Sequence, residues 1–290
     1  MNKCFAVPAM FLALFFLDAC RFSSQKWETE VLLACDSTEL TNLKIKVVLP
    51  RTGHSSEPAR EKVRAILVSV MDHSLASVAS YEGKRLFPTY DGDTEDTQAL
   101  LEYYRRETSS AFGREAASAC EEMKTYMEED SGWTFPAWEY DFSIQKAGES
   151  QRYIVFDATE YSYRGGAHGG VGGEGSLTFD KKDGTLVRDW LLPDCLGPMQ
   201  PLLRKGLAEY FSDNGESVSP DDLTSYLLLE PGEQTLPLPA WSPFPSDKGL
   251  VFTYQQYEIA AYAAGMPNFT IPYDAIRPFL TPKALELLRL

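Results

Sequence analysis

The alternation of apolar and polar residues beyond position 137 constrains the fold most strongly. From Trp138 to Ile144, large apolar side chains alternate with polar ones, which is typical of a half-buried strand. Residues 146–149 predict a turn, and residues 153–163 predict the return strand. Together these segments predict a long antiparallel hairpin.

The return strand ends at a glycine-rich segment that contains a histidine. Four glycines lie within residues 165–170, on both sides of His168, and the chain has only three histidines. An ordinary turn does not need so many glycines, so either the backbone takes positive φ angles or another group approaches it closely. A phosphate-binding loop is not indicated, because strand-like residues 176–179 follow where such a loop requires a helix.

The segment before this hairpin predicts two strands and two long helices. We expect strands at residues 27–34 and 43–49, then a helix with an apolar stripe at residues 58–80. A second helix is expected at residues 97–130, broken or kinked near Gly113.

The segment after the hairpin predicts shorter elements. Asp183-Gly184 predicts the turn of a second hairpin. The remaining expected elements are helices at 198–212 and 220–229, strands at 249–262 and 269–272, and a terminal helix at 282–290. Strands grouped with helices indicate the α+β class, with antiparallel sheets and helices packed on them. We expect two consecutive subdomains, at residues 27–135 and 136–290.

Residues 1–19 predict a lipoprotein signal peptide. Lys3 is followed by an apolar run from Phe5 to Leu17, which is too short to span a membrane. Cys20 follows Leu-Asp-Ala, which resembles the box at which bacterial lipoproteins are cleaved and lipidated, although Asp18 departs from the usual small residue. We therefore expect a lipid on Cys20, a tether at residues 20–26 and an extracytoplasmic location in the cell envelope, periplasmic or at the surface. A cleaved signal without a lipid is the alternative.

The charge of the chain bounds its partners. The formal net charge is −15 at pH 7, so repulsion opposes binding to nucleic acid. A basic protein is a plausible partner, whereas the simpler interpretation is that acidity keeps an exported protein soluble.

No cofactor or metal ion is expected. The three histidines are scattered, and no spacing of cysteines is typical of zinc. After loss of the signal and lipidation of Cys20, three thiols remain and allow one disulfide at most, with the pairing left open: Cys35, Cys120 and Cys195. Residues 91–96 are acidic and resemble part of a calcium loop, but the central glycine and the distal glutamate do not fit, which favours a solvated loop.

His168 has three interpretations: it fastens the loop to backbone, contacts a ligand or acts as a general base. Catalysis needs an orienting carboxylate, but the spacing of Glu160, Glu174 and Asp180 matches no catalytic motif. We assign no catalytic residue. The candidate ligand-binding residues are Tyr161, Tyr163, Arg164, Gly165, Gly166 and His168. Tyr and Arg anchor many interfaces, although alternating tyrosines also pack half-buried on sheets.

Three stretches carry a resemblance to a known family. They are residues 161–169 (YSYRGGAHG), residues 177–192 (LTFDKKDGTLV, then DWLL) and residues 252–274 (FTYQQYEIAAYAAG, then FTIPYD). In order and spacing they resemble an extracytoplasmic domain of unknown function, shared by the lysozyme-responsive anti-sigma-V factor and some peptidoglycan deacetylases, over roughly residues 137–285. The preceding segment resembles more weakly the partner domain that usually comes before it.

The resemblance implies an extracytoplasmic α+β module of which at least one relative binds lysozyme. It implies no catalytic activity, because the deacetylases carry their chemistry on a separate metal-dependent domain that has no counterpart in residues 1–290. The leading hypothesis is a lipoprotein that binds lysozyme, another basic protein or a peptidoglycan-related glycan. The alternatives are an enzyme acting on envelope carbohydrate and a structural or assembly lipoprotein.

Overall fold

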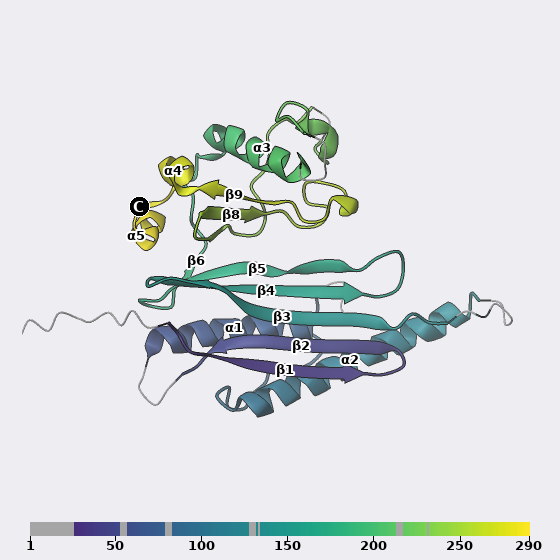
Figure 1. Ribbon diagram of the computed structural model, residues 1–290. Coiled ribbons are helices and arrows are strands. Elements are labelled where there is room, and N and C mark those ends of the chain that lie inside the picture. The colour runs from purple at the N-terminus through teal and green to yellow at the C-terminus, as the bar shows by residue number, and fades with distance from the viewer. Residues whose placement is uncertain are drawn as a thin grey trace, which may run out of the picture.

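The computed structural model describes residues 26–52, 57–78, 83–127, 132, 134–212, 217–230 and 232–290. A large sheet carries two helices on one face, and a smaller unit of helices and short strands lies along one edge of that sheet (Figure 1). The predicted α+β class is confirmed.

The large sheet has the strand order β1-β2-β3-β4-β5-β6. Its strands are β1 (Thr29–Ser37), β2 (Thr41–Pro50), β3 (Trp138–Glu149), β4 (Tyr153–Tyr163), β5 (Gly170–Asp180) and β6 (Leu186–Val187). Both predicted hairpins, β3–β4 and β5–β6, are confirmed. Neighbouring strands are antiparallel except β2 and β3, which are parallel. That pair departs from the expected antiparallel sheets, and it is possible because α1 (Pro58–Ala76) and α2 (Thr97–Lys124) form the crossover between the two strands.

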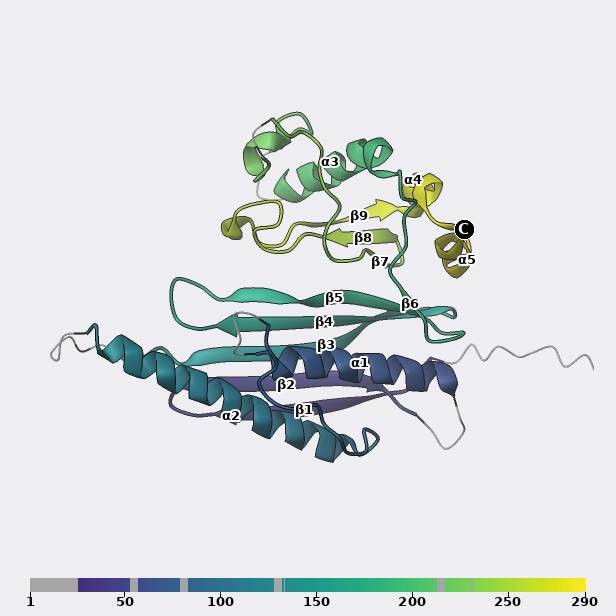
Figure 2. The same cartoon turned by 180° about the vertical axis from the view of Figure 1, so that it is seen from behind.

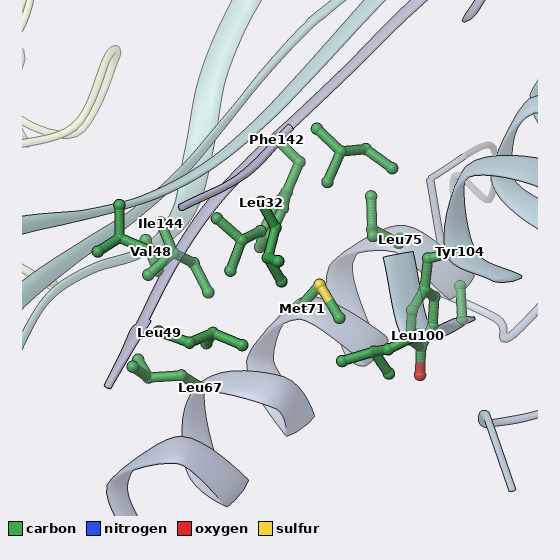
Figure 3. Close-up of a cluster of buried hydrophobic side chains, with 14 of the residues drawn as sticks. Leu32, Val48, Leu49, Leu67, Met71, Leu75, Leu100, Tyr104, Phe142 and Ile144 are labelled. Atoms are coloured by element: carbon green, nitrogen blue, oxygen red, sulfur yellow. The ribbon is translucent and has the colours of Figure 1, made fainter. Parts of the chain in front are cut away.

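The helices α1 and α2 cover one face of the large sheet (Figure 2), and the first hydrophobic core lies between them. Met71 and Leu75 of α1 lie near Tyr104 of α2 and near Phe142 of β3 (Figure 3). The alternating apolar residues of β3 therefore face the helices, while the polar residues between them face away.

The smaller unit encloses a second hydrophobic core. Its strands β7 (Phe244–Pro245), β8 (Gly249–Thr253) and β9 (Asn268–Pro272) form a three-stranded antiparallel sheet. Its helices are α3 (Leu196–Ser212), α4 (Tyr273–Ile276) and α5 (Pro282–Leu288), with short 3-10 helices at Leu223–Tyr226, Tyr262–Ala264 and Arg277–Phe279. Trp190, Phe252 and Tyr254 are among its largest fully buried side chains.

The two cores separate within the β5–β6 hairpin. The first draws on residues from Trp27 to Phe179, and the second on residues from Val187 to Leu287. The boundary predicted at residue 136 lies just before β3, and β3 pairs with β2 from the other side of that boundary in one sheet. The division into separate subdomains at residues 27–135 and 136–290 stays a prediction.

Three predicted elements differ from the structure. Helix α2 continues through Gly113, since one glycine costs only about 1 kcal/mol in a helix that packing supports. Residues 220–229 hold only the 3-10 helix Leu223–Tyr226. Strand β8 ends at Thr253 rather than 262, because a turn follows in which Glu258 N donates to Gln255 O.

Carboxylates of the acidic loop at residues 91–96 form hydrogen bonds and an ion pair within the protein. Asp96 accepts a hydrogen bond from Ala99 N and so caps α2. Asp93 accepts one from Glu95 N, and the Glu95 carboxylate pairs with Arg64. These carboxylates therefore support local structure.

No helix in the described part of the chain is long and apolar enough to cross a membrane. Cys35, Cys120 and Cys195 all carry free thiols. The predicted signal peptide and Cys20 lie outside the described residues and stay predictions.

Candidate functional site

The glycine-rich segment forms the tip of the β4–β5 hairpin and the first half of β5. Tyr161 pairs with Val171, and Ser162 pairs with Gly170, so strand pairing resumes at Gly170, two positions after His168. Gly165 and Gly166 have φ angles of +81° and +95°, which glycine adopts without the steric cost that other residues meet. The tip therefore needs two of its glycines for backbone conformation.

The glycines within β5 allow a close approach by Trp241. A Cβ atom at Gly175 would lie 2.5 Å from Cδ2 of that indole ring. The indole Nε1 donates a hydrogen bond to Gly173 O at 2.9 Å. Gly173 has φ +106°, and its Cβ would lie 2.7 Å from Ala158 O at a register shift between β4 and β5. Both explanations that the sequence offered for the glycines thus apply, and at Gly173 and Gly175 they apply at the same position.

A second side chain also reaches the backbone of β5. Gln256 Oε1 accepts a hydrogen bond from Val171 N at 2.9 Å. Strand β6 pairs with β5 only at Thr178 and Phe179, so Gln256 and Trp241 cover the part of the β5 edge that lacks a neighbouring strand. Side chains from the smaller unit therefore protect this edge of the large sheet.

His168 lies among tyrosines that come from the smaller unit. Its ring stacks on Tyr262, with centroids 3.7 Å apart and planes 15° apart. Nδ1 lies 2.9 Å from Gly169 O, and Nε2 lies 3.3 Å from the Tyr257 hydroxyl. Because a carbonyl oxygen can only accept, Nδ1 donates in the first contact, and in the neutral ring Nε2 is then the acceptor for the Tyr257 hydroxyl. His168 thus fastens the hairpin tip to the smaller unit and remains exposed.

Tyr257 takes a backbone conformation that is unusual for an aromatic residue. Its φ is +64°, and its side chain is 56% exposed. The Glu258 carboxylate holds this turn, because it accepts hydrogen bonds from Gln255 N at 2.7 Å and from Ala240 N at 2.6 Å. An exposed ring on a strained backbone is a reason to look for a function at this position.

Carboxylates lie beside the aromatic cluster. Glu139 and Asp141 of β3 are exposed and pair in register with Tyr163 and Tyr161. Partial burial, followed by the negative charge of Glu139, raises the pKa of Tyr161 above its ordinary value. We call the set of Tyr161, Tyr163, His168, Tyr257, Tyr262, Glu139 and Asp141 the aromatic–acidic surface.

Two predicted binding residues lie away from this surface. Arg164 donates to Val78 O and sits 5.9 Å over the Trp138 ring, on the side that α1 covers. A Cβ at Gly165 would lie 3.3 Å from Pro136. The structure thus groups Tyr161, Tyr163 and His168, while a ligand-binding role for each of the six predicted residues stays a prediction.

Three carboxylates that lie near His168 in sequence have other partners. Glu160 accepts from the Tyr140 hydroxyl at 2.6 Å, Glu174 pairs with Arg188 at 3.0 Å, and Asp180 pairs with Lys283. Within the described ranges, no group of three or more His, Cys, Asp and Glu residues could hold a metal ion. None of these three carboxylates therefore orients the His168 ring.

Residues 195–274 match the family described as "Protein of unknown function (DUF3298)". This part of the chain is a DUF3298 domain. The third resembling stretch, residues 252–274, lies within it, and the other two stretches end before residue 195. Trp241, Gln256, Tyr257 and Tyr262 therefore belong to the DUF3298 domain, whereas the glycine-rich hairpin that they contact does not.

Two crystal structures share the fold of nearly the whole chain. A DUF3298 family member from Bacteroides fragilis is 16% identical with a TM-score of 0.64, and the match covers 92% of this chain and 99% of that one. A DUF3298 family protein from Pseudomonas aeruginosa is 14% identical with a TM-score of 0.55, and the match covers 90% of this chain and 97% of that one. The comparison with curated proteins gives no match. The shared fold thus includes both hydrophobic cores.

Sequence reasoning missed the site residues of the DUF3298 domain. Tyr257, Tyr262 and Gln256 lie in a stretch that was expected to be strand, and Trp241 lies in a loop without a motif. The spacing of tyrosines in residues 252–274 was the one available signal, and it does not say which ring meets His168.

Proposed function

We propose that this protein is a lipid-anchored, extracytoplasmic binding protein whose aromatic–acidic surface takes a basic protein partner. The observation that carries the proposal is the exposed Tyr257, held beside His168 and Tyr262. The carboxylates of β3 lie beside Tyr161 of the same surface. Lysozyme is the first partner to test, because the resembling family includes a lysozyme-binding relative and because C-type lysozymes are basic.

The chemistry of this surface fits cationic side chains. Tyrosine rings anchor interfaces because they bury a large area and lose little conformational entropy. A Lys or Arg of a partner can lie over a tyrosine face while it pairs with Glu139 or Asp141. The net charge of −15 accelerates the encounter with a basic protein at low salt.

The test is calorimetry of residues 21–290 with a C-type lysozyme at two salt concentrations, with an equally basic unrelated protein as the control. This chain contains every described helix and strand. We expect saturable one-to-one binding that is weaker at high salt and missing for the control protein. Tyr257→Ala should weaken binding by about tenfold or more.

The matched variant is Tyr126→Ala, which removes another exposed tyrosine, 78% accessible, just after the end of α2. It should leave binding unchanged. Equal binding of both basic proteins, or equal effects of the two variants, would contradict recognition at the aromatic–acidic surface. Peptidoglycan fragments and endogenous envelope partners are then measured with the same pair of variants.

The lipid anchor needs a separate test. In cells given labelled palmitate, the wild-type chain should take up label and sediment with membranes, whereas Cys20→Ser should do neither. A soluble, unlabelled wild-type protein would favour a cleaved signal without a lipid.

A further inference from the structure

A basic cavity lies at the opposite end of the large sheet from His168. It has a volume of about 410 Å³ and is lined by Trp27, by the turn before β4, by the end of β5 with the two residues that follow it, and by α5 with the residue that follows it. Five cationic side chains line it: Arg152, Lys181, Lys182, Lys283 and Arg289. Only two acidic residues do so, Asp180 and Glu286. This local excess of positive charge contrasts with a chain of net charge −15.

Three of these cations are not neutralised by a carboxylate. Lys283 pairs with Asp180, and Lys181 pairs with Glu149. Arg152 donates to a backbone carbonyl, and Arg289 donates to the Gln151 amide oxygen at 2.8 Å. Among the described residues, neither these arginines nor the exposed Lys182 forms an ion pair with a carboxylate. Guanidinium and ammonium groups held together in this way attract phosphate oxygens.

The cavity lies next to the tether of the predicted lipid anchor. Trp27 lines it and lies beneath two cations, with Lys181 Nζ 5.7 Å and Arg60 Cζ 5.4 Å from the ring centroid. Trp27 follows Cys20 by seven positions, which an extended chain spans in at most about 25 Å. A lipid on Cys20 would therefore hold the basic cavity close to the membrane surface.

We propose that this cavity docks on the phosphate-bearing headgroups of anionic phospholipids and orients the protein on its membrane. The overall negative charge opposes such docking only weakly, because salt screens charges beyond about 8–10 Å. The tether supplies a high effective concentration, so a weak local attraction is sufficient. The effective concentration and the orientation that the tether supplies rest on the lipid anchor proposed above, whereas the basic cavity itself does not.

The proposed orientation places the aromatic–acidic surface far from the membrane. The cavity takes residues from the turn just before β4 and from the end of β5, and His168 lies in the loop between the other ends of these strands. Each strand has 11 residues, which corresponds to roughly 35 Å. Figure 1 shows the same separation, with α5 at one end of the molecule and the β4–β5 loop at the other. A partner would then approach from the side away from the lipid.

The test measures hydrogen exchange of the membrane-held protein by mass spectrometry. Residues 21–290 with an N-terminal histidine tag are bound to vesicles that contain a nickel-chelating lipid, so the native lipid is not required. One vesicle is otherwise pure phosphatidylcholine, and the other is an equal mixture of phosphatidylcholine and phosphatidylglycerol. We expect slower exchange in peptides covering residues 150–153, 180–183 and 283–290 on the anionic vesicle alone, and loss of this protection at high salt.

The variant Lys182→Glu with Arg289→Glu should lose the protection. Each basic residue near an anionic surface changes binding roughly fivefold, so two reversals should weaken docking by well over tenfold. The control pair is Lys44→Glu with Lys205→Glu, which changes the net charge equally at exposed positions on β2 and α3. It should keep the protection.

Equal exchange on both vesicles, or protection that survives the double reversal, would overturn the proposal. Glycerol phosphate is added as a soluble competitor. If it removes the protection when its concentration is below that of the lipid phosphate, the cavity binds a free phosphate ester and the membrane assignment is wrong. Lysozyme calorimetry is done without vesicles, so its failure is independent of these outcomes.

Discussion

The two hydrophobic cores differ in how much backbone pairing supports them. The first lies on strands of 9 to 12 residues that pair along their length. The second lies on strands of only 2, 5 and 5 residues. The smaller unit therefore depends more on its buried side chains and on its contact with β5. The exposed His168 and Tyr257 lie at that contact, where neither core alone determines the geometry.

The largest effect should come from Phe252→Ala in the second core. Phe252 is fully buried and stacks on Phe269, with ring planes 8° apart. We expect a loss of about 3–5 kcal/mol in the free energy of unfolding, measured by urea denaturation. If the cores unfold separately, hydrogen exchange should accelerate in residues 187–287 and stay slow in residues 27–180.

The matched variant is Phe142→Ala, which opens a cavity in the first core, where this residue is 1% exposed. It should accelerate hydrogen exchange in residues 27–180 and leave exchange slow in residues 187–287. The same loss of protection in both regions for either variant would show that the two cores unfold as one cooperative unit.

A smaller effect is expected for Gly175→Ala at the contact between the two units. The added Cβ would lie 2.5 Å from the Trp241 ring, at a φ of +69°. We expect a loss of about 2–3 kcal/mol, because the ring must move and because left-handed backbone disfavours alanine. Thermal unfolding measures this change in the free energy of unfolding.

Gly170→Ala is the control, since its Cβ would meet nothing within 4 Å. Its stability should stay within about 0.5 kcal/mol of wild type. In the Trp241→Ala background, Gly175→Ala should lower the free energy of unfolding much less than it does in the wild-type protein. Additive losses would contradict the steric explanation.

The pH dependence of the first core should reveal the pair of Asp72 with Arg85. Burial raises the pKa of Asp72, but hydrogen bonds from Arg85 and Tyr104 outweigh it and hold the pKa below its ordinary value. A carboxylate whose pKa is lowered by folding stabilises the protein at pH values above its ordinary pKa of about 4. This stabilisation is lost as the pH falls through the pKa of the folded state. Asp72→Asn should therefore cost about 2 kcal/mol at neutral pH and little in acid.

Denaturant unfolding at several pH values measures this difference. Glu102→Gln removes an exposed carboxylate that pairs with Arg105, and it should change stability little at any pH. If the free energies of unfolding of Asp72→Asn and wild type differed by the same amount at every acidic pH, this would contradict the role assigned to the negative charge of Asp72.

The smallest effect concerns the strained Tyr257. Tyr257→Gly should keep or raise stability by up to about 1 kcal/mol, because glycine accepts φ +64° without strain. Tyr257→Ala removes the same ring but retains the strain, so it should be less stable than the glycine variant. Both variants should weaken partner binding equally; a difference in binding would mean that the backbone, rather than the ring, is recognised.

Several elements follow from the local sequence. The alternation around Phe142 predicts β3, the apolar stripe at residues 58–80 predicts α1, and Asp183-Gly184 predicts the β5–β6 turn. Each depends on contacts near in sequence or on the burial of one face, which a periodic pattern records directly. The expected start of the second helix at residue 97 agrees with α2, which Asp96 caps in the structure.

The partners of these elements do not follow from the pattern. The period of two in β2 and β3 says that each buries one face, and it does not say that the two pair in parallel across the crossover. The tyrosines at 257 and 262 likewise looked like strand residues, because the turn held by Glu258 leaves no periodic trace.

The sequence by itself determined the α+β class, most of the strands and helices, and the choice between positive φ angles and a close approach at the glycines around His168. The tertiary structure alone decided that Trp241 and Gln256 cover the glycine-rich edge, that Tyr257 and Tyr262 surround His168, and that basic residues distant in sequence gather beside Trp27. The physical reason is that propensity and periodicity act over a few neighbouring residues, whereas packing joins segments far apart in the chain: Gly173 and Trp241 are 68 positions apart, and His168 and Tyr257 are 89 apart.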